Sequence, residues 1–225
     1  MVIPHFIFKN KNSIDFGIIV NTLPPIQTVD EEFEYIEVPG RNGYLTISTN
    51  RKPTLEKTIV ISMPPSANIS SIKRWLSGSG ELILSNDPDV FYIARIQTIR
   101  NLKEVAKDGK TSLIFSCQPE AYLHTGDNIK TITISNTKIY NSEDESYPLI
   151  KIYGDGPVSL YVNSTIQEFD DVDEYVEIDS KLMETYKDNS YVTFTGDFPT
   201  LIPGENNISW DGTVTNIEVT PRWQR

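Results

Sequence analysis

Short runs of alternating apolar and polar residues, separated by Gly, Pro, Asn and Asp, constrain the fold more than any other feature of this chain. They dominate its second half. Alternation with a period of two puts apolar side chains on one face of a strand. Regular turn signals between such runs are typical of a β-sandwich or a jelly roll. We expect strands at 130–136, 149–153, 158–163, 174–178, 192–195, 207–210 and 216–220, turns at 154–157 and 211–212, and at most a helical turn or two at 180–187.

The first half of the chain predicts a second β domain that contains one helix. Apolar runs predict strands at 6–8, 14–20, 33–38, 45–49, 57–63, 81–85, 90–96 and 111–117. In the segment 68–78, Ile69, Ile72 and Trp75 fall on one face at helical spacing, and Asn68 or Ser70 can cap the first turn. The sequence therefore predicts a mainly β protein with one α-helix.

The charge distribution divides the chain in the same place. Residues 1–120 carry 13 basic and 13 acidic side chains, whereas residues 121–225 carry 7 and 18, so the net charge of −11 belongs to the second half. Such a shift indicates two domains with different surroundings. We expect an N-terminal domain at 1–120, a linker at 121–130 and a C-terminal domain at 131–225. An acidic surface repels nucleic acid and anionic wall polymers, which argues against both as partners of the second half.

The single cysteine and the absence of long apolar runs limit the cellular setting. Cys117 excludes an intramolecular disulfide, and its apolar run predicts a buried, inert thiol. We therefore expect synthesis in a reducing cytoplasm. No apolar run approaches the length that spans a bilayer, and the N-terminus lacks the basic start and cleavage site of a secretory signal, so we expect no membrane insertion.

The stretch from 38 to 44 predicts a hairpin tip between two alternating runs. Asn-Gly favours a tight turn, and a Pro marks a strand end or an edge. One interpretation is an ordinary hairpin, with Arg41 bound inside it. The other is a long arm at about 39–55 that pairs with another chain, because an exposed strand edge invites such pairing. The candidate residues for an inter-subunit arm are Gly40, Arg41, Asn42, Gly43, Tyr44, Arg51 and Lys52.

The residues needed for catalysis are missing from any recognisable pattern. His5 and His124 stand in no triad or metal spacing, and no Gly-rich loop precedes a helix. We expect no enzyme activity, no cofactor and no metal. The acidic run 170–174 lacks the glycine and the final glutamate of a calcium loop and is expected to be solvated.

Sugar binding stays open as a function of the second half. Exposed aromatic side chains would bind sugars, although the same side chains would also fill a core: Tyr161, Tyr175, Tyr186, Tyr191 and Trp210.

Short motifs along the whole chain share their order and spacing with one family. They are Ile14-Asp15-Phe16-Gly17, Val38-Pro39-Gly40-Arg41-Asn42-Gly43, the Trp75 helix with its following Gly-Glu-Leu strand and the Asp-Pro turn to Phe91-Tyr92, Phe115-Ser116-Cys117-Gln118-Pro119 followed by Tyr122, and Asn207-Ile208-Ser209-Trp210-Asp211-Gly212 with Pro221-Arg222-Trp223 at the end. In these motifs the chain resembles the distal tail proteins of long-tailed, flexible-tailed bacteriophages, encoded by a phage or a prophage. These proteins are the hub between the tail tube and the receptor-binding baseplate.

The resemblance implies a structural role in the virion. It implies an N-terminal β-sandwich with one helix that forms a homo-hexameric ring, in which each protruding hairpin arm embraces the neighbouring subunit. A galectin-like or jelly-roll β-sandwich would follow at the C-terminus. The implied partners are further copies of the chain, the tail tube protein, the tail-tip protein and, in some members, a receptor-binding protein. The genome would pass through the lumen without specific binding, and the protein would be made in the host cytoplasm and reside in the tail tip.

Two further expectations concern surfaces. The neutral N-terminal domain would pack in the ring, and the acidic C-terminal domain would lie at larger radius, where repulsion between copies is screened.

The competing function is a carbohydrate-binding adhesin that recognises host cell-wall glycans through the C-terminal sandwich. This chain shows no inserted sugar-binding module, and such modules are what the resemblance associates with sugar recognition.

Overall fold

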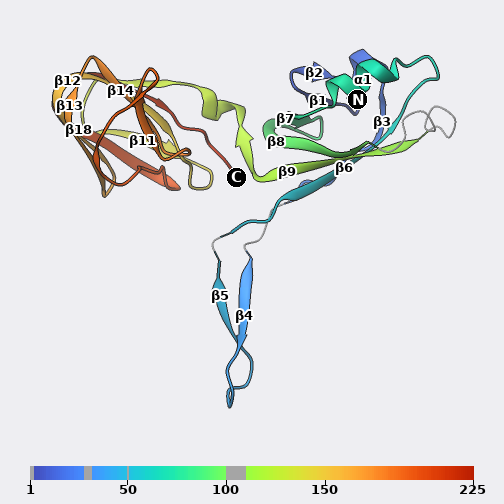
Figure 1. The fold of residues 1–225 in the computed structure, drawn as a ribbon, viewed down its shortest axis with the longest axis horizontal. Coiled ribbons are helices and arrows are strands. Elements are labelled where there is room, and N and C mark those ends of the chain that lie inside the picture. The colour runs from blue at the N-terminus through green and yellow to red at the C-terminus, as the bar shows by residue number, and fades with distance from the viewer. Residues whose placement is uncertain (1–2, 28–31, 50, 100–109) are drawn as a thin grey trace. The chain divides into compact units, whose positions relative to one another are not determined.

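The computed structural model describes residues 3–27, 32–49, 51–99 and 110–225, and the chain divides into two compact units, Met1–Ala121 and Tyr122–Arg225. We call them unit 1 and unit 2. Both are built from antiparallel β-structure, which confirms the expected fold class (Figure 1). Within the described ranges the only α-helix is α1 (Ile69–Trp75), as the sequence predicted.

Unit 1 contains a seven-stranded sheet in the order β2-β1-β7-β8-β9-β6-β3 and a separate two-stranded sheet, β4-β5. Asn68 caps α1 by accepting a hydrogen bond from the backbone amide of Ser71, 3.1 Å away. The elements are β1 (Phe6–Phe8), β2 (Lys11–Asn12), η1 (Ser13–Phe16), β3 (Ile19–Thr22), β4 (Phe33–Glu37), β5 (Tyr44–Ser48), β6 (Leu55–Ser62), α1, β7 (Ser79–Leu84), β8 (Asp87–Ile99) and β9 (Thr111–Leu123).

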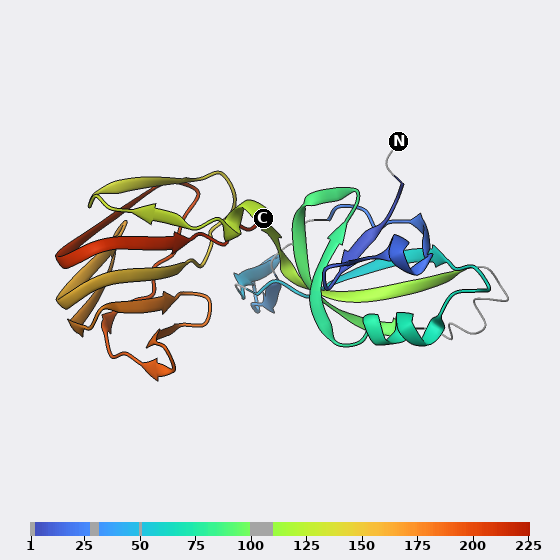
Figure 2. The ribbon, with the colours of Figure 1, turned by 90° about the horizontal axis from the view of Figure 1, so that it is seen from above.

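Trp75 attaches α1 to the sheet. Its ring stacks on Phe6 of β1 at 5.5 Å between centroids and on Phe16 of η1 at 4.2 Å, and its indole nitrogen donates to the carbonyl of Phe8 at 2.7 Å. The views in Figures 1 and 2 both place α1 against the sheet. The helix ends at Trp75, and Gly78, three residues further on, takes a positive φ of 80°. A seven-residue helix depends on such packing, since short isolated helices are marginal in water.

The core of unit 1 encloses one lysine beside the single cysteine. Lys57 of β6 is 1% exposed, and its ammonium lies 4.1 Å from the ring centroid of Tyr92. Burial lowers the pKa of Lys57, although the nearby Cys117 and Asp87 act in the opposite direction. Cys117 is buried and unbridged, as expected, and burial raises the pKa of its thiol to about 11.

Strand β9 continues across the boundary between the units. Its ladder with β6 stops at Cys117, so the missing amide of Pro119 breaks no bond of that ladder. The strand then runs on to Leu123, although the sequence predicted that it would end at 117. Proline is tolerated in a strand where no ladder partner requires its nitrogen.

Unit 2 is a nine-stranded antiparallel sheet that curls on itself around one core (Figure 2). The two long strands, β12 and β18, pair with each other along almost their whole length. The elements are η2 (His124–Asp127), β10 (Lys130–Ile132), β11 (Thr137–Asn141), β12 (Leu149–Val162), β13 (Thr165–Val172), β14 (Tyr175–Asp179), β15 (Glu184–Lys187), β16 (Ser190–Tyr191), β17 (Thr195–Gly196) and β18 (Gly204–Thr220).

Two expected turns are bends within these long strands, so the prediction of turns at 154–157 and 211–212 was wrong. The β12–β18 register shifts after Tyr153 and again before Val158. Gly156 has a φ of 74° and Gly212 of 105°, conformations that glycine adopts without strain. Bulges bend a strand without ending it. The first half of β12 therefore pairs with β14 and the second half pairs with β13, so the bend lets one strand continue from one part of the curled sheet to the other.

The segment 180–187, for which the sequence predicted at most a helical turn or two, forms a turn and then β15, which pairs with β14 through Tyr186 and Thr185. The sequence analysis also missed β11 and β13, whose alternation is interrupted by polar residues at inward positions. One of these is Gln167, which is 1% exposed. Tertiary contacts override local propensity at such positions.

A buried ion pair closes unit 2. Arg222 donates from both terminal nitrogens to the two carboxylate oxygens of Asp179, at 2.7 and 2.8 Å. The backbone amides of Lys181 and Leu182 donate to the same carboxylate, at 3.0 Å each. The segment around Arg222 also bonds to the start of the unit, because its amide donates to the carbonyl of Gly126. The first and last segments of unit 2 are therefore joined.

Candidate assembly surface: the hairpin of β4 and β5

The hairpin 32–49 pairs only with itself among the described residues. Its register joins Phe33 with Ser48, Tyr35 with Thr46 and Glu37 with Tyr44. At its base, the amide and the hydroxyl of Thr49 both bond to the carbonyl of Glu32, at 3.0 and 2.8 Å. These bonds fix the register, so opposed residues lie on known faces.

One face of the hairpin is aromatic. Phe33, Tyr35 and Tyr44 share this face with Glu37, and the rings of Tyr35 and Tyr44 meet edge to face at 6.2 Å between centroids. The three aromatic side chains are 47–64% exposed. We call this surface the aromatic face.

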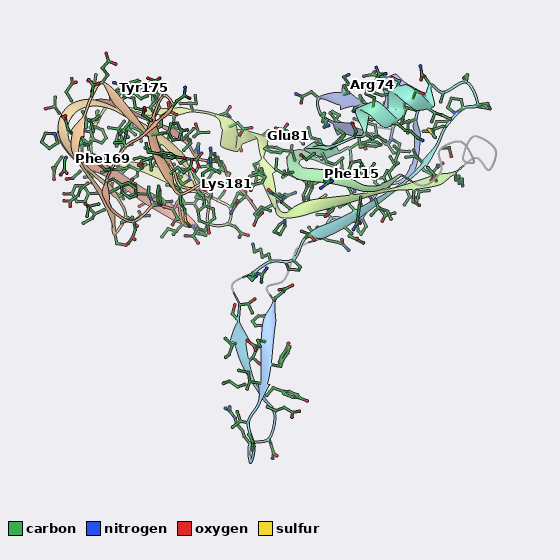
Figure 3. All side chains as sticks on the ribbon, viewed as in Figure 1. Arg74, Glu81, Phe115, Phe169, Tyr175 and Lys181 are labelled. Carbon is green, nitrogen blue, oxygen red and sulfur yellow. The ribbon has the colours of Figure 1, made fainter. Side chains whose placement is uncertain are left out.

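The opposite face is aliphatic. It carries Ile36, Val38, Leu45 and Ile47 together with Glu34. The four aliphatic side chains are 38–43% exposed, and side chains project from both faces of the hairpin in Figure 3. We call this surface the aliphatic face.

Apolar side chains on both faces distinguish this hairpin from an ordinary edge of a sheet. A solvated hairpin of a soluble protein usually places polar residues on at least one face. An isolated two-stranded hairpin is also marginally stable in water. Full burial of each large apolar side chain stabilises a contact by about 1.5–3 kcal/mol. The hairpin therefore has the chemistry of a segment that another protein surface covers on both sides.

The residues predicted for an arm lie at the tip of this hairpin and after it. Gly40 and Gly43 have φ values of 82° and 85°, and the amide of Arg41 donates to the carbonyl of Val38 at 3.1 Å. Asn42 does not have a positive φ, so the connection 38–43 is a six-residue loop and not a two-residue Asn-Gly turn. Arg41 is exposed, and no described residue accepts a hydrogen bond from its side chain.

The other predicted residues sit differently. Tyr44 belongs to β5 and to the aromatic face. Arg51 and Lys52 follow the hairpin and are exposed, and the carbonyl of Arg51 accepts from the amide of Glu32. Leu55, at the end of the predicted arm, is the first residue of β6 and pairs with Cys117.

The residues predicted for the arm include the tip but, apart from Tyr44, not the apolar surface along the strands. A signal was present in the sequence, because 33–38 and 44–47 carry apolar residues in both alternating registers. A half-buried strand carries them in one register. Apolar residues in both registers of a short, Gly-Pro-bounded hairpin indicate a strand pair that is covered on both faces.

Histidine, cysteine and acidic side chains do not form a metal-binding cluster in the described residues. Within 3–27, 32–49, 51–99 and 110–225, no three His, Cys, Asp or Glu side chains gather as a metal site would require. The imidazole of His5 lies within hydrogen-bond distance of the carbonyl of Ile3. His124 is the first residue of η2 in unit 2, so the two histidines lie in different units. Of the acidic run 170–174, Asp173 and Glu174 pair with Lys187 at 2.7 and 3.3 Å. None of the described helices has the length and apolarity to cross a bilayer.

Comparison with known proteins gives a match in structure but not in sequence. No family model matches the chain, and neither does any curated protein sequence. The chain is similar to the crystal structure of the Dit protein of phage SPP1, described as a paradigm of the hub adsorption apparatus in phages that infect Gram-positive bacteria. The similarity has a TM-score of 0.75 at 12% identity and covers 100% of both chains. A chain of the phage p2 baseplate, in its activated conformation with strontium, gives a TM-score of 0.49 at 10% identity. The similarity to SPP1 Dit shows that the whole chain has the fold of that protein.

Proposed function

We propose that this protein is a structural hub of the distal tail of a long-tailed bacteriophage. The observation that carries the proposal is the agreement of fold with SPP1 Dit along the full length of both chains. A fold alone does not determine function, so the proposal also rests on a surface suited to assembly. In this function the chain is a virion component of the tail tip and a partner of other baseplate proteins, without enzyme activity.

The hairpin is the element that joins the subunits. Its aromatic and aliphatic faces are exposed in the single chain, and an interface that covers both would remove seven large apolar side chains from water. We propose that six chains form a closed ring in which each hairpin contacts the next protomer. A head-to-tail contact of this kind closes into a ring when the rotation from one subunit to the next is a whole fraction of a full turn.

The ring would connect the tail tube protein to the tail-tip protein and, in some phages, to a receptor-binding protein. The charge distribution agrees with this arrangement. The first 120 residues are neutral overall and suit close packing of six copies, whereas the acidic second half suits larger radius. The genome would pass through the lumen without specific contacts.

The tip supplies a polar contact to the same interface. Arg41 has an exposed guanidinium, and Arg51 follows the hairpin base. A guanidinium binds a carboxylate through two parallel hydrogen bonds, which adds orientation to an apolar contact. We propose that Arg41 or Arg51 binds a carboxylate of the adjacent protomer.

Absolute mass tests this function. Light scattering over a range of concentrations should give a species of six or twelve chains for the intact protein. Replacement of residues 33–48 by a short Gly-Ser linker should give a folded monomer, because the deletion leaves the seven-stranded sheet of unit 1 intact. Persistence of the multimer in the deletion variant would show that the hairpin does not join the subunits.

Carbohydrate binding by unit 2 is the second candidate, and one cavity favours it. The strands β15 and β16 pair Tyr186 with Tyr191 beside a cavity of about 280 Å³. Tyr191 is 78% exposed, and the cavity also offers carboxylate, amide and hydroxyl groups from Glu184, Asp188, Asn189 and Ser190. Exposed aromatic rings stack on the apolar faces of sugars, and the polar groups would bind hydroxyls. Of the other expected aromatics, Tyr161 bonds to Asp211, Tyr175 bonds to Asp188, and Trp210 packs against the core.

A glycan array and a cell-wall pull-down separate the two candidates. Saturable binding of a neutral glycan that is lost in Tyr191→Ala, and retained in Tyr140→Ala, would support the adhesin. Tyr140 is a matched control, because it is also an exposed tyrosine on a strand of unit 2 but lies outside the cavity. Ring formation without glycan binding would leave the hub as the function.

A further inference from the structure

A cationic pocket with an aromatic floor lies on unit 1, outside the hairpin. Its volume is about 270 Å³, and three basic side chains surround it: Lys9, Lys11 and Arg74. The remaining lining comes from Phe16, Trp75 and Ser71. None of the residues that line the pocket is acidic, although the whole protein carries a net charge of −11. We call it the basic pocket.

The floor of the basic pocket is held in place. The rings of Phe16 and Trp75 lie parallel within 4°, with centroids 4.2 Å apart, and the bond from Trp75 to the carbonyl of Phe8 fixes the indole. Trp75 also stacks on Phe6 and is 6% exposed, so Phe16 carries most of the exposed aromatic surface of the floor. A rigid aromatic surface binds an apolar side chain without losing much conformational entropy of its own.

Two of the three cations are available to a ligand. Lys9 donates to the carbonyl of Ser77, whereas Lys11 and Arg74 are exposed and bond to no acidic group among the described residues. Figure 3 labels Arg74 on α1, in contrast to Phe115, which is buried in the core of the same unit. The pocket therefore offers an aromatic surface beside two unneutralised positive charges, and its ligand should combine an aromatic or apolar group with a carboxylate.

The chemistry of the basic pocket fits side chains of a second protein surface. The pocket is open, and its charge is complementary to that of one surface already described. The aromatic face of the hairpin presents Tyr35 and Tyr44 with Glu37 on the same side.

We propose that the aromatic face of one copy docks in the basic pocket of a second copy. Tyr35 or Tyr44 would pack against the Phe16 ring of this floor, and the carboxylate of Glu37 would pair with Arg74 or Lys11. This inference rests on the proposed function in one respect, the joining of subunits by the hairpin, and it adds the receiving surface. The same chain does not satisfy the contact, because its own Tyr35 and Tyr44 are 64% and 59% exposed.

Aromatic character, and not charge, selects between the two faces of the hairpin. Each face carries one carboxylate, Glu37 on the aromatic face and Glu34 on the aliphatic face. Only the aromatic face combines its carboxylate with tyrosine rings, which stack on aromatic side chains and tolerate partial exposure of their hydroxyl groups. The aliphatic face is left for a different surface of the assembly.

Site-directed cross-linking tests the docking directly. A chain with Glu37→Cys is mixed with a tagged chain with Arg74→Cys and treated with a short thiol-specific bifunctional linker. The buried native thiol of Cys117, with its pKa raised to about 11, should not react. The matched control replaces Glu37→Cys by Glu34→Cys on the opposite face. We expect about ten-fold more mixed dimer from the Glu37 pair, as a preference of about 1.4 kcal/mol would give.

Equal yields from the two pairs would overturn the docking. The mass measurement keeps this failure separate from failure of the proposed function. A wild-type ring without selective cross-linking would keep the hub and reject the basic pocket as the receiving surface. Selective cross-linking with no closed species would support the docking and reject the ring.

Charge exchange provides an independent readout. Glu37→Arg or Arg74→Glu alone should reduce the multimeric fraction by placing like charges together, and the combined chain should restore it. Lys73→Glu is the matched control, because Lys73 is the exposed neighbour of Arg74 on α1 but does not line the pocket. Failure of the combined chain to exceed both single variants would contradict a direct Glu37–Arg74 contact.

Discussion

Replacing Arg222 by Met should destabilise unit 2 without affecting unit 1. Arg222 forms a two-bond pair with Asp179, whose side chain is 5% exposed. Methionine keeps much of the length of the arginine stem but removes both donors. The carboxylate of Asp179 then remains buried with the backbone amides of Lys181 and Leu182 as its donors. The loss therefore comes from an incompletely compensated buried charge.

The expected magnitude is about 2 kcal/mol. Removing one partner of a fully buried ion pair costs about 3–5 kcal/mol, and an exposed pair contributes at most about 1 kcal/mol. The side chain of Arg222 is 23% exposed, and two amides still donate to Oδ1 of Asp179 while Oδ2 loses the donor that Arg222 supplied, so the effect should lie between these limits. For a unit of about 100 residues, a loss of 2 kcal/mol lowers the melting temperature by about 8–16 °C.

Calorimetry measures this shift, and hydrogen exchange read out by peptide assigns it to one unit. Two units need not unfold together, so each transition is followed separately. Lys138→Met is the matched control, because the Lys138–Glu205 pair lies in the same unit with both side chains 64% exposed. It should change the free energy of unfolding by less than about 1 kcal/mol.

Two results would refute the reasoning. One is a shift for Arg222→Met no larger than that of Lys138→Met. The other is an equal shift when Asp179 has already been replaced by Asn, because the energy would then come from contacts of Arg222 other than the ion pair. The double-mutant cycle isolates the pair term.

Three further predictions follow from single residues. Burial would raise the pKa of Asp179, but the bonds from Arg222 and from the backbone amides of Leu182 and Lys181 hold it below its usual value. The stabilisation by this carboxylate is therefore present above a pH of about 4 and is lost as the pH falls through its folded-state pKa. In Asp179→Asn, the free energy of unfolding of unit 2 should depend less on pH in the acid range. Gly154→Ala should lower the free energy of unfolding in urea by about 3 kcal/mol, because the added Cβ would meet the carbonyl oxygen of Thr213 at 2.3 Å. Gly156→Ala has open space around the added Cβ and should lower it by about 1 kcal/mol, the cost of its positive φ. Burial raises the pKa of Cys117 from 9.0 to about 11, which lowers its thiolate fraction about 100-fold. Its reaction with a disulfide reagent near pH 8 should therefore be rapid in urea and negligible in the native protein. A rapid reaction of the native protein would contradict the burial of this thiol.

Local patterns predicted α1 and the position of the hairpin well. The helix has an Asn cap, three apolar residues on one face and a glycine after its end, all within a few turns of chain. The hairpin has two strands separated by a glycine-rich loop. These features depend on residues close in sequence, where periodicity and backbone preference act directly.

The strands of unit 2 were predicted less accurately because their ends depend on distant partners. Gly156 and Gly212 are turn signals in the sequence, yet Gly156 lies within the register shift of β12, and Gly212 pairs with Val158 directly after that shift. A glycine with positive φ serves a turn and a bulge equally well. The choice between them required the pairing of β12 with β18, which are separated by more than forty residues in the sequence.

The candidate surfaces show the same division. Arg41 and the tip were found from turn chemistry, and the apolar residues in both registers of 33–47 were readable in the sequence. The basic pocket was not, because Lys9 and Lys11 meet Arg74 only when β1, β2 and α1 pack together. Side chains more than sixty residues apart become neighbours through burial of Trp75 against Phe6 and Phe8.

The sequence by itself determined that the protein is mainly β, with one short helix, a hairpin between two alternating runs, and an acidic second half. These properties follow from residue spacing and from charge, which are local or additive. Only the tertiary structure decided which runs join into long bent strands, that Asp179 meets Arg222, that both faces of the hairpin are uncovered, and that three cations surround an aromatic floor. Each of these depends on contacts between distant segments, whose energy is realised only when the whole unit packs.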